Sequence, residues 1–120
     1  MLKRTKFIIT DNSGVRLARC LRIDKRKTKL NLMGSVIIVS VRSIKSQSKI
    51  KIGDVFRALI IRSKLKLHRL SGQSTLFCEN AAVLLNQKNE LVSTRIFGPV
   101  SKELRKKKLL KVLCLATDIV

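Results

Sequence analysis

The sequence predicts a mainly β protein, a small barrel or sandwich with a short helical part near its C-terminus. Three observations predict this class. The 120 residues suffice for one hydrophobic core and are too few for two ordinary domains. Hydrophobic residues make up 45% of the chain, which excludes a disordered basic tail. The Ile, Leu and Val residues fall into short runs separated by polar or glycine-containing breaks, the pattern of strands and turns. We therefore expect one domain over residues 1–120.

Seven short apolar runs are the expected strands. They cover residues 6–10, 17–23, 36–41, 55–62, 75–78, 81–86 and 111–115. The breaks between them, such as Asn12-Ser13-Gly14 and Ser71-Gly72, have turn chemistry, because Asn, Ser and Gly accept the backbone angles of tight turns. In residues 62–70, Lys and His alternate loosely with Leu, which indicates a ribbon with one charged face.

One helix is expected, near the end of the chain. Gly98 can serve as its cap with Pro99 in the first helical position, and residues 100–108 then supply about two turns with a cationic last turn. The barrel would thus occupy about residues 1–98, and the helix and last strand about residues 99–120.

The positive charge is large and unevenly distributed. The net charge is +20, and residues 1–69 alone hold 19 Lys and Arg against 3 acidic residues, whereas residues 70–101 are close to neutral. Such an unpaired density repels itself and is most easily neutralised by a polyanion, so it points to nucleic acid. Trp and Tyr are absent and Phe occurs four times, which argues against base stacking and favours contacts to phosphate. A merely solvated charged surface is the alternative, disfavoured by the scarcity of acidic counterparts.

The residues do not favour an enzyme, a metal site or a cofactor site. His68 is the single histidine and has no carboxylate near it in the sequence. The acids Asp11, Asp24, Asp54 and Glu79 are scattered among turns, and no glycine-rich loop could hold a nucleotide. We therefore expect a non-catalytic protein without metal or cofactor.

The three cysteines and the apolar runs limit the compartment. Cys20, Cys78 and Cys114 are too widely spaced for a zinc pair or a disulfide framework, so each is expected to be a small buried hydrophobe in a reducing compartment. The apolar runs are far shorter than a membrane span, and the apolar part of residues 1–10 is too short for a secretory signal.

Several motifs in order resemble one family, the universal large-subunit ribosomal protein L-fourteen. The family signature is matched by residues spread over 58–84: Ala58-Leu59-Ile60-Ile61, Ser71-Gly72, Phe77, Asn80 and Val83-Leu84. The other matches are Asp11-Asn12-Ser13-Gly14, Lys51-Ile52-Gly53-Asp54-Val55, Glu79-Asn80-Ala81-Ala82-Val83, Thr94-Arg95-Ile96-Phe97-Gly98-Pro99-Val100 and Glu103-Leu104-Arg105. Six matches in order across the chain make chance an implausible explanation.

The resemblance implies a five-stranded β-barrel with a short C-terminal helical part. It implies a structural constituent of the large ribosomal subunit that binds large-subunit rRNA at the subunit interface and helps form inter-subunit bridges to small-subunit rRNA during translation. The implied protein partners are neighbouring large-subunit proteins and a ribosome silencing factor. The residues expected to contact a protein partner are Thr94, Arg95, Phe97 and Lys111. The alternative for Thr94 and Arg95 is that they close a strand and pair with Glu103.

The residues expected to bind rRNA are the cations of the N-terminal half together with the Asn-Ser turn and the histidine of the ribbon. They are Lys3, Arg4, Lys6, Asn12, Ser13, Arg22, Lys25, Arg26, Lys27, Lys29, Arg42, Lys45, Lys49, Lys51, Arg62, Lys64, Lys66, His68 and Arg69.

The organelle and one alternative function stay open. Heavy use of Lys, Ile, Leu and Asn is typical of an AT-rich genome, and no cleavable presequence precedes the family match, so a mitochondrial ribosome is favoured over a bacterial or plastid one. The alternative function is a free RNA-binding or RNA-annealing module on an OB-like barrel. It would leave the ribosome in high salt, whereas a structural constituent would stay.

Overall fold

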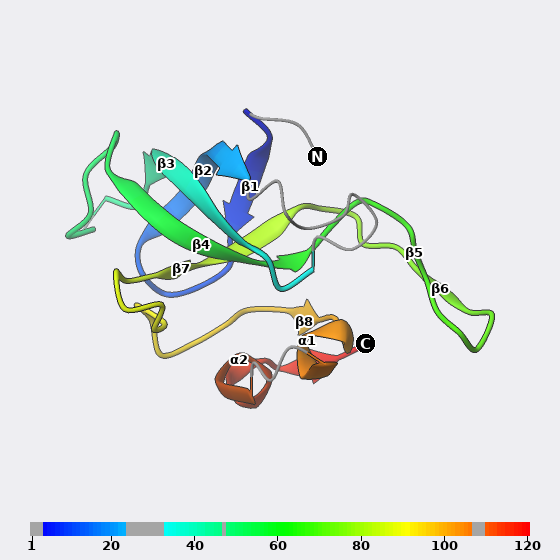
Figure 1. Cartoon of the computed structure of the whole chain (residues 1–120). Coiled ribbons are helices and arrows are strands. Elements are labelled where there is room, and N and C mark those ends of the chain that lie inside the picture. Colours follow the sequence, from blue (N-terminus) through cyan, green and yellow to red (C-terminus); the bar gives the residue numbers. More distant parts are fainter. Residues whose placement is uncertain (1–3, 24–32, 47, 107–109) are drawn as a thin grey trace.

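Five strands form a closed barrel at the centre of the molecule (Figure 1). The computed structural model describes residues 4–23, 33–46, 48–106 and 110–120. The barrel strands, in spatial order, are β1 (Lys6–Ile9), β2 (Val15–Ile23), β3 (Val36–Ile44), β4 (Val55–Arg62) and β7 (Ala81–Leu85). Neighbouring strands pair antiparallel except β1 and β7, whose parallel pairing closes the barrel. The expected five-stranded barrel is confirmed.

The interior of the barrel follows from the alternation of residues along each strand. In β1, Phe7 and Ile9 are buried while Lys6 and Ile8 point outward, because successive side chains face opposite sides of a sheet. Phe7 packs with Ile37, Val39, Ile60 and Leu84 from the other strands into one apolar cluster. Burial of such side chains at roughly 1.5–3 kcal/mol each is the main stabilising contribution to the barrel.

Two strands are buried on both faces. All five residues of β7 and the last five of β4 are buried, so neither shows the alternation of β1. Their outward side chains, including Leu59, Ile61 and Val83, belong to a second apolar cluster formed with the C-terminal residues Val100 and Leu104. The C-terminal residues therefore cover the barrel at β7 and at the second half of β4.

A narrow ribbon projects from the barrel beyond β4 (Figure 1). It contains the short strands β5 (Leu67–His68) and β6 (Ser74–Thr75), which pair antiparallel around a tip at Gly72. The expected strand over residues 75–78 is wrong beyond Thr75, because Leu76 and Cys78 are exposed and have no neighbouring strand. The ribbon lengthens the molecule, which measures 44 × 28 × 27 Å.

The C-terminal unit lies against the outer side of β4 and β7. It consists of β8 (Pro99–Val100), α1 (Glu103–Lys106), α2 (Leu110–Leu115) and β9 (Asp118–Ile119), and β8 pairs parallel with β9. Two expectations were wrong here. Pro99 lies in a strand rather than at the start of a helix, and residues 111–115 form α2 rather than a strand. The adjacent residues Val112 and Leu113 both belong to the second cluster. Adjacent residues of a strand face opposite sides and, as in β4 and β7, belong to different clusters, so this burial fits a helix.

Candidate nucleic-acid interface

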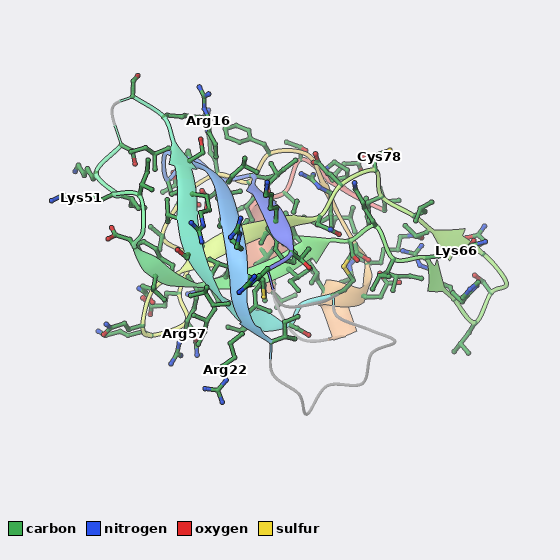
Figure 2. All side chains as sticks on the ribbon, turned by 90° about the horizontal axis from the view of Figure 1, so that it is seen from above. Arg16, Arg22, Lys51, Arg57, Lys66 and Cys78 are labelled. Atoms are coloured by element: carbon green, nitrogen blue, oxygen red, sulfur yellow. The ribbon has the colours of Figure 1, made fainter. Side chains whose placement is uncertain are left out.

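Four cations from three strands lie on the open outer side of the barrel. We call Lys6, Arg19, Arg22 and Arg57 the barrel face. Lys6 is opposite Arg19 in the pairing of β1 with β2, so the two side chains share a face. Arg22 and Arg57 both pair with Ile38 of β3, one from each side. Figure 2 shows Arg22 and Arg57 extending away from the barrel on the same side.

The barrel face carries positive charge without acidic partners. None of the ion pairs between described residues includes its four members. Arg57 donates a hydrogen bond from Nη1 to Oδ1 of Asn89 at 2.9 Å, which steadies it and leaves its charge uncompensated. Such guanidinium groups can form paired hydrogen bonds with phosphate oxygens.

A second group of cations lies in the connection between β3 and β4. Lys45, Lys49 and Lys51 are exposed there, and Arg42 is exposed near the end of β3. Asp54 fixes the turn by accepting a hydrogen bond from the Lys51 amide at 3.1 Å, and Gly53 allows it with a φ of 95°. The Lys51 side chain points away from the molecule (Figure 2).

The ribbon carries the third group. Lys66 and His68 are exposed and Leu67 between them is buried, so the expected alternation holds over residues 66–68 and does not extend to Leu65 and Leu70, which are exposed. Lys64 is exposed at the base of the ribbon, next to Ser63. Figure 2 places Lys66 and Lys51 at opposite ends of the molecule. The candidate contacts are thus spread along its long axis.

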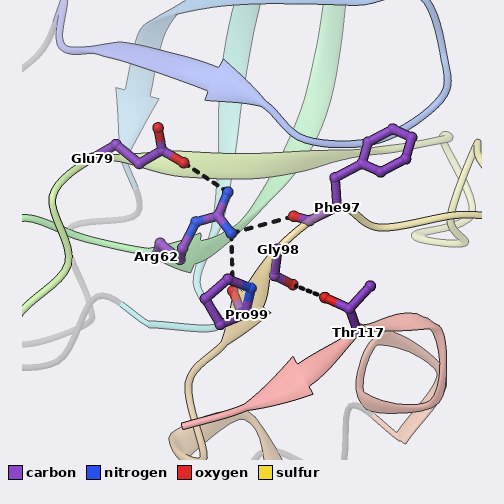
Figure 3. A network of polar contacts seen from close by, with 6 residues as sticks. All are labelled: Arg62, Glu79, Phe97, Gly98, Pro99 and Thr117. Atoms are coloured by element: carbon purple, nitrogen blue, oxygen red, sulfur yellow. Dashed lines mark hydrogen bonds and ion pairs between the residues drawn. The ribbon is translucent and has the colours of Figure 1, made fainter.

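Arg62 is not on this surface. Only 5% of the residue is exposed, and its guanidinium group joins three parts of the chain (Figure 3). Nη2 pairs with Oε1 of Glu79 at 2.8 Å, while Nη1 donates to the backbone oxygens of Phe97 at 3.2 Å and Pro99 at 3.1 Å. Burial lowers the pKa of Arg62, and Glu79 opposes this shift. An arginine with internal partners is unavailable to phosphate, so Arg62 does not belong with the exposed candidates.

Gly98 lets the chain pass close to Arg62. Its φ is 82°, and a Cβ at this position would lie 2.2 Å from Nη1 of Arg62. The Gly98 oxygen also accepts a hydrogen bond from Oγ1 of Thr117 at 3.1 Å, which ties the end of α2 to the same point (Figure 3). Arg62, Gly98 and Thr117 therefore fasten the C-terminal unit to the barrel.

Arg69 is also used internally. It is half-buried, and its Nε donates to Oε1 of Glu103 at 2.9 Å while its Nη2 donates to the backbone oxygen of Val120 at 2.8 Å. Among the ion pairs of the described residues, Glu103 pairs with Arg69 and none includes Arg95, so the expected alternative pairing of Arg95 with Glu103 is not found there.

The residues expected to contact a protein partner are exposed on the 94–97 segment and on α2. Thr94, Arg95 and Phe97 are exposed, and the buried Ile96 among them packs in the second cluster with Val112 and Leu113. These two residues follow the exposed Lys111 on α2. One apolar cluster thus anchors both the 94–97 segment and the helix that carries Lys111.

The expected rRNA contacts differ in exposure. The exposed ones are Arg4, Lys6, Asn12, Arg22, Arg42, Lys45, Lys49, Lys51, Lys64, Lys66 and His68; Ser13 and Arg69 are half-buried, and Arg62 is buried. Lys3, Lys25, Arg26, Lys27 and Lys29 lie outside the described residues. Arg16, Arg19 and Arg57 are further cations on the outer side of the barrel that were not among the expected contacts. The alternation of β2 and β4 could have identified them as outward positions between inward apolar residues.

The cysteines are only partly as expected. Cys20 is buried, and burial raises the pKa of its thiol. Cys78 and Cys114 are exposed, so the expectation that each would be buried is wrong for these two. No group of three or more potential metal ligands occurs among the residues that the structure describes. Within the same residues, no helix is long and apolar enough to cross a membrane.

The comparison with known families agrees with the fold and the charge. The sequence model of the family described as ribosomal protein L14p/L23e matches residues 1–120. This confirms the resemblance, and with it a non-enzymatic structural constituent of the large ribosomal subunit that acts in translation and whose partners are rRNA and ribosomal proteins. The chain belongs to the ribosomal protein L14p/L23e family.

Proposed function

We propose that this protein binds large-subunit rRNA at the subunit interface and helps form inter-subunit bridges to small-subunit rRNA. The observation that carries the proposal is the exposed charge: the barrel face, in which Lys6, Arg22 and Arg57 are exposed and Arg19 is half-buried, the β3–β4 connection and the ribbon present cations that are not paired with acids among the described residues. Each contact to phosphate releases condensed counterions, which favours binding and makes it sensitive to salt. The contacts would position the protein by backbone and shape rather than by base sequence.

The elongated shape supports a bridging role. The β3–β4 connection and the ribbon lie at opposite ends of the molecule, whose longest dimension is 44 Å (Figure 1). Cations at both ends can engage separate rRNA segments at once, and the rigid barrel between them fixes their distance. A protein of this shape can therefore link two RNA elements without base-specific contacts.

The 94–97 segment and α2 are the proposed contact for proteins. Thr94, Arg95, Phe97 and Lys111 would meet a neighbouring large-subunit protein or a ribosome silencing factor. Two properties support this. Residues 70–101, which contain Thr94, Arg95 and Phe97, are close to neutral, and Phe97 is 46% exposed, a feature typical of the apolar centre of protein interfaces.

The proposed compartment is the mitochondrial matrix, with a bacterial cytoplasm or a plastid as the alternatives. The support is compositional, namely the abundance of Lys, Ile, Leu and Asn. Ribosomes purified separately from mitochondria, from plastids and from the cytosol, and searched for this chain by mass spectrometry, would decide between the compartments.

Sedimentation of ribosomal subunits in high salt tests the central proposal. The chain should be recovered with the large subunit at one copy per particle, measured by mass spectrometry against other large-subunit proteins. Recovery only at the top of the gradient would instead indicate the free RNA-binding module. In joined ribosomes, ultraviolet crosslinks from this chain should reach both rRNAs. Crosslinks to large-subunit rRNA alone would contradict the bridge.

Charge reversal at Arg95 tests the protein contact. Arg95→Glu should weaken binding of a recombinant silencing factor to purified large subunits at least tenfold, because an exposed cation facing the partner becomes an anion. Lys88→Glu, which makes the same change at another exposed position of the near-neutral 70–101 segment, is the matched control. Equal binding to both variants would exclude Arg95 from the contact.

A further inference from the structure

The side chain of Asn12 holds Thr94 by two hydrogen bonds. Its Oδ1 accepts from the Thr94 amide at 3.2 Å, and its Nδ2 donates to Oγ1 of Thr94 at 3.2 Å. The two residues are 82 positions apart in the chain. A turn expected to bind rRNA is thereby joined to the first residue of the segment expected to bind protein.

The turn that carries Asn12 is itself firmly fixed. Asp11 is 2% exposed, and its carboxylate accepts hydrogen bonds from the amide of Leu84 at 3.0 Å and the amide of Ser13 at 3.1 Å. The Ser13 hydroxyl also bonds to this carboxylate. Gly14, with a φ of 92°, packs so tightly on Ser48 that a Cβ would lie 2.7 Å from its Oγ. Asn12 is therefore a rigid support and not a loosely held loop residue.

The 94–97 segment runs along this support. Asp11 forms a β-bridge with Ile96, and the Phe97 amide donates to the oxygen of Thr10 at 2.7 Å. These backbone contacts fix the second half of the segment. At its beginning, the Thr94 amide is held by the Asn12 side chain instead. The orientation of Thr94 consequently depends on one amide group.

We propose that Asn12 is a positioning residue of the protein-contact surface, which holds Thr94 in its binding orientation, and is not a phosphate contact. The inference rests on the proposed function of the 94–97 segment. It gives the Asp-Asn-Ser-Gly turn a role in protein recognition, whereas the cations of the barrel face, the β3–β4 connection and the ribbon bind RNA.

Two substitutions at one position separate these roles. Asn12→Ala removes both hydrogen bonds to Thr94. Asn12→Asp retains an acceptor for the Thr94 amide, and its second oxygen can accept from the Thr94 hydroxyl, whose hydrogen is free to rotate. The added negative charge would repel a phosphate at the same place. If Asn12 positions Thr94, Asn12→Asp should therefore restore silencing-factor binding. If Asn12 contacts a phosphate, Asn12→Asp should weaken rRNA binding more than Asn12→Ala does.

The experiment measures both kinds of binding with full-length variants. In large subunits carrying Asn12→Ala, affinity for a recombinant silencing factor should fall about five- to thirtyfold, the effect of one or two hydrogen bonds. Asn12→Asp should restore it to within about threefold of the unchanged protein. The affinity of either free variant for large-subunit rRNA should stay within about twofold. If Asn12→Asp weakens rRNA binding more than Asn12→Ala does, and silencing-factor binding is unaffected, the proposal is overturned.

The Arg95→Glu variant separates failure of this inference from failure of the proposed function. If Arg95→Glu weakens silencing-factor binding and Asn12→Ala does not, Asn12 has no positioning role. If neither changes that binding, the protein contact lies elsewhere, and exchange of the Thr94 amide hydrogen then decides the positioning role. Asn12→Ala should accelerate that exchange at least tenfold and Asn12→Asp should not; equal rates in all three proteins would refute the inference.

Discussion

The two ends of strand β4 use arginine in opposite ways. Arg57, near its beginning, is exposed on the barrel face and is not ion-paired with any described acid. Arg62, at its end, is buried beneath the C-terminal unit and pairs with Glu79. The difference arises from what covers the strand, because only its second half lies under the second apolar cluster. Whether an arginine of this strand faces the solvent or holds the chain together internally therefore depends on whether the C-terminal unit covers it.

The largest expected difference between the two ends is in stability. Arg62→Met should lower the free energy of unfolding by about 2–4 kcal/mol, because it leaves the oxygens of Phe97 and Pro99 without their donor and removes a buried guanidinium group that pairs with the half-buried Glu79. Arg57→Met, on the same strand, should change it by less than about 0.5 kcal/mol. Urea unfolding of the two variants measures this, and equal destabilisation would remove the distinction.

A second comparison tests the close approach of the Gly98 backbone to the guanidinium group of Arg62. Gly98→Ala should cost about 2–3 kcal/mol, since the added Cβ would lie 2.2 Å from Nη1 of Arg62. Gly72→Ala at the ribbon tip is the matched control. Its φ of 84° is nearly that of Gly98 and nothing lies within 4 Å, so only the backbone cost of about 1 kcal/mol remains. Thermal unfolding should rank the variants in that order, and a reversal would show that Arg62 moves aside freely.

A smaller effect is expected at Arg69. Arg69→Gln should lower the free energy of unfolding by about 1 kcal/mol, because the Arg69 side chain is 20% exposed, against 6% for Arg62, so water can reach the atoms that lose their partner. Hydrogen exchange should increase mainly in α1 and β9, the elements next to Glu103 and Val120. Exchange that increases equally in the barrel would contradict a local fastening role.

The barrel face should show the smallest change in stability and a clear change in RNA binding. In Arg22→Gln and Arg57→Gln the free energy of unfolding should stay within about 0.5 kcal/mol. Each variant should bind rRNA several-fold more weakly, with the slope of log affinity against log salt reduced by about 0.7–0.9 per lost contact. Arg62→Met should leave that slope unchanged. Salt titrations that show a constant slope for Arg22 and Arg57 would exclude them as phosphate contacts.

Much of the barrel could be predicted because each strand is recognisable from the pattern of its own residues. All five of its strands coincide with apolar runs that were expected from the sequence to be strands, and the turn at Gly53 and Asp54 behaves as its sequence indicates. The C-terminal unit could not be predicted in the same way. Pro99 lies in β8 because it pairs with Asp118, a partner that no local pattern reveals. The helix α2 depends on a cluster supplied by β4 and β7.

The residues of the candidate site likewise divide into those that local sequence predicts and those that depend on distant parts of the chain. Lys51 and Lys66 were predictable, since charged residues in turns and on one face of a ribbon have to lie in solvent. The internal role of Arg62 was not, because Glu79 and the backbone of Phe97 and Pro99 come from distant parts of the chain. The contact between Asn12 and Thr94 was hidden for the same reason. Charge density predicts a binding surface but not which members of it face inward.

The parallel pairing of β1 with β7 has a consequence for synthesis. Since these are the first and the last barrel strands in the chain, the barrel closes only after β7 has left the ribosome that makes it. Until then β1 and β4 expose unpaired edges, which in many proteins invite association with other chains. The strong positive charge of the nascent segment should make identical chains repel one another during this interval. The cations that we propose bind RNA would thus also protect the nascent chain from aggregation.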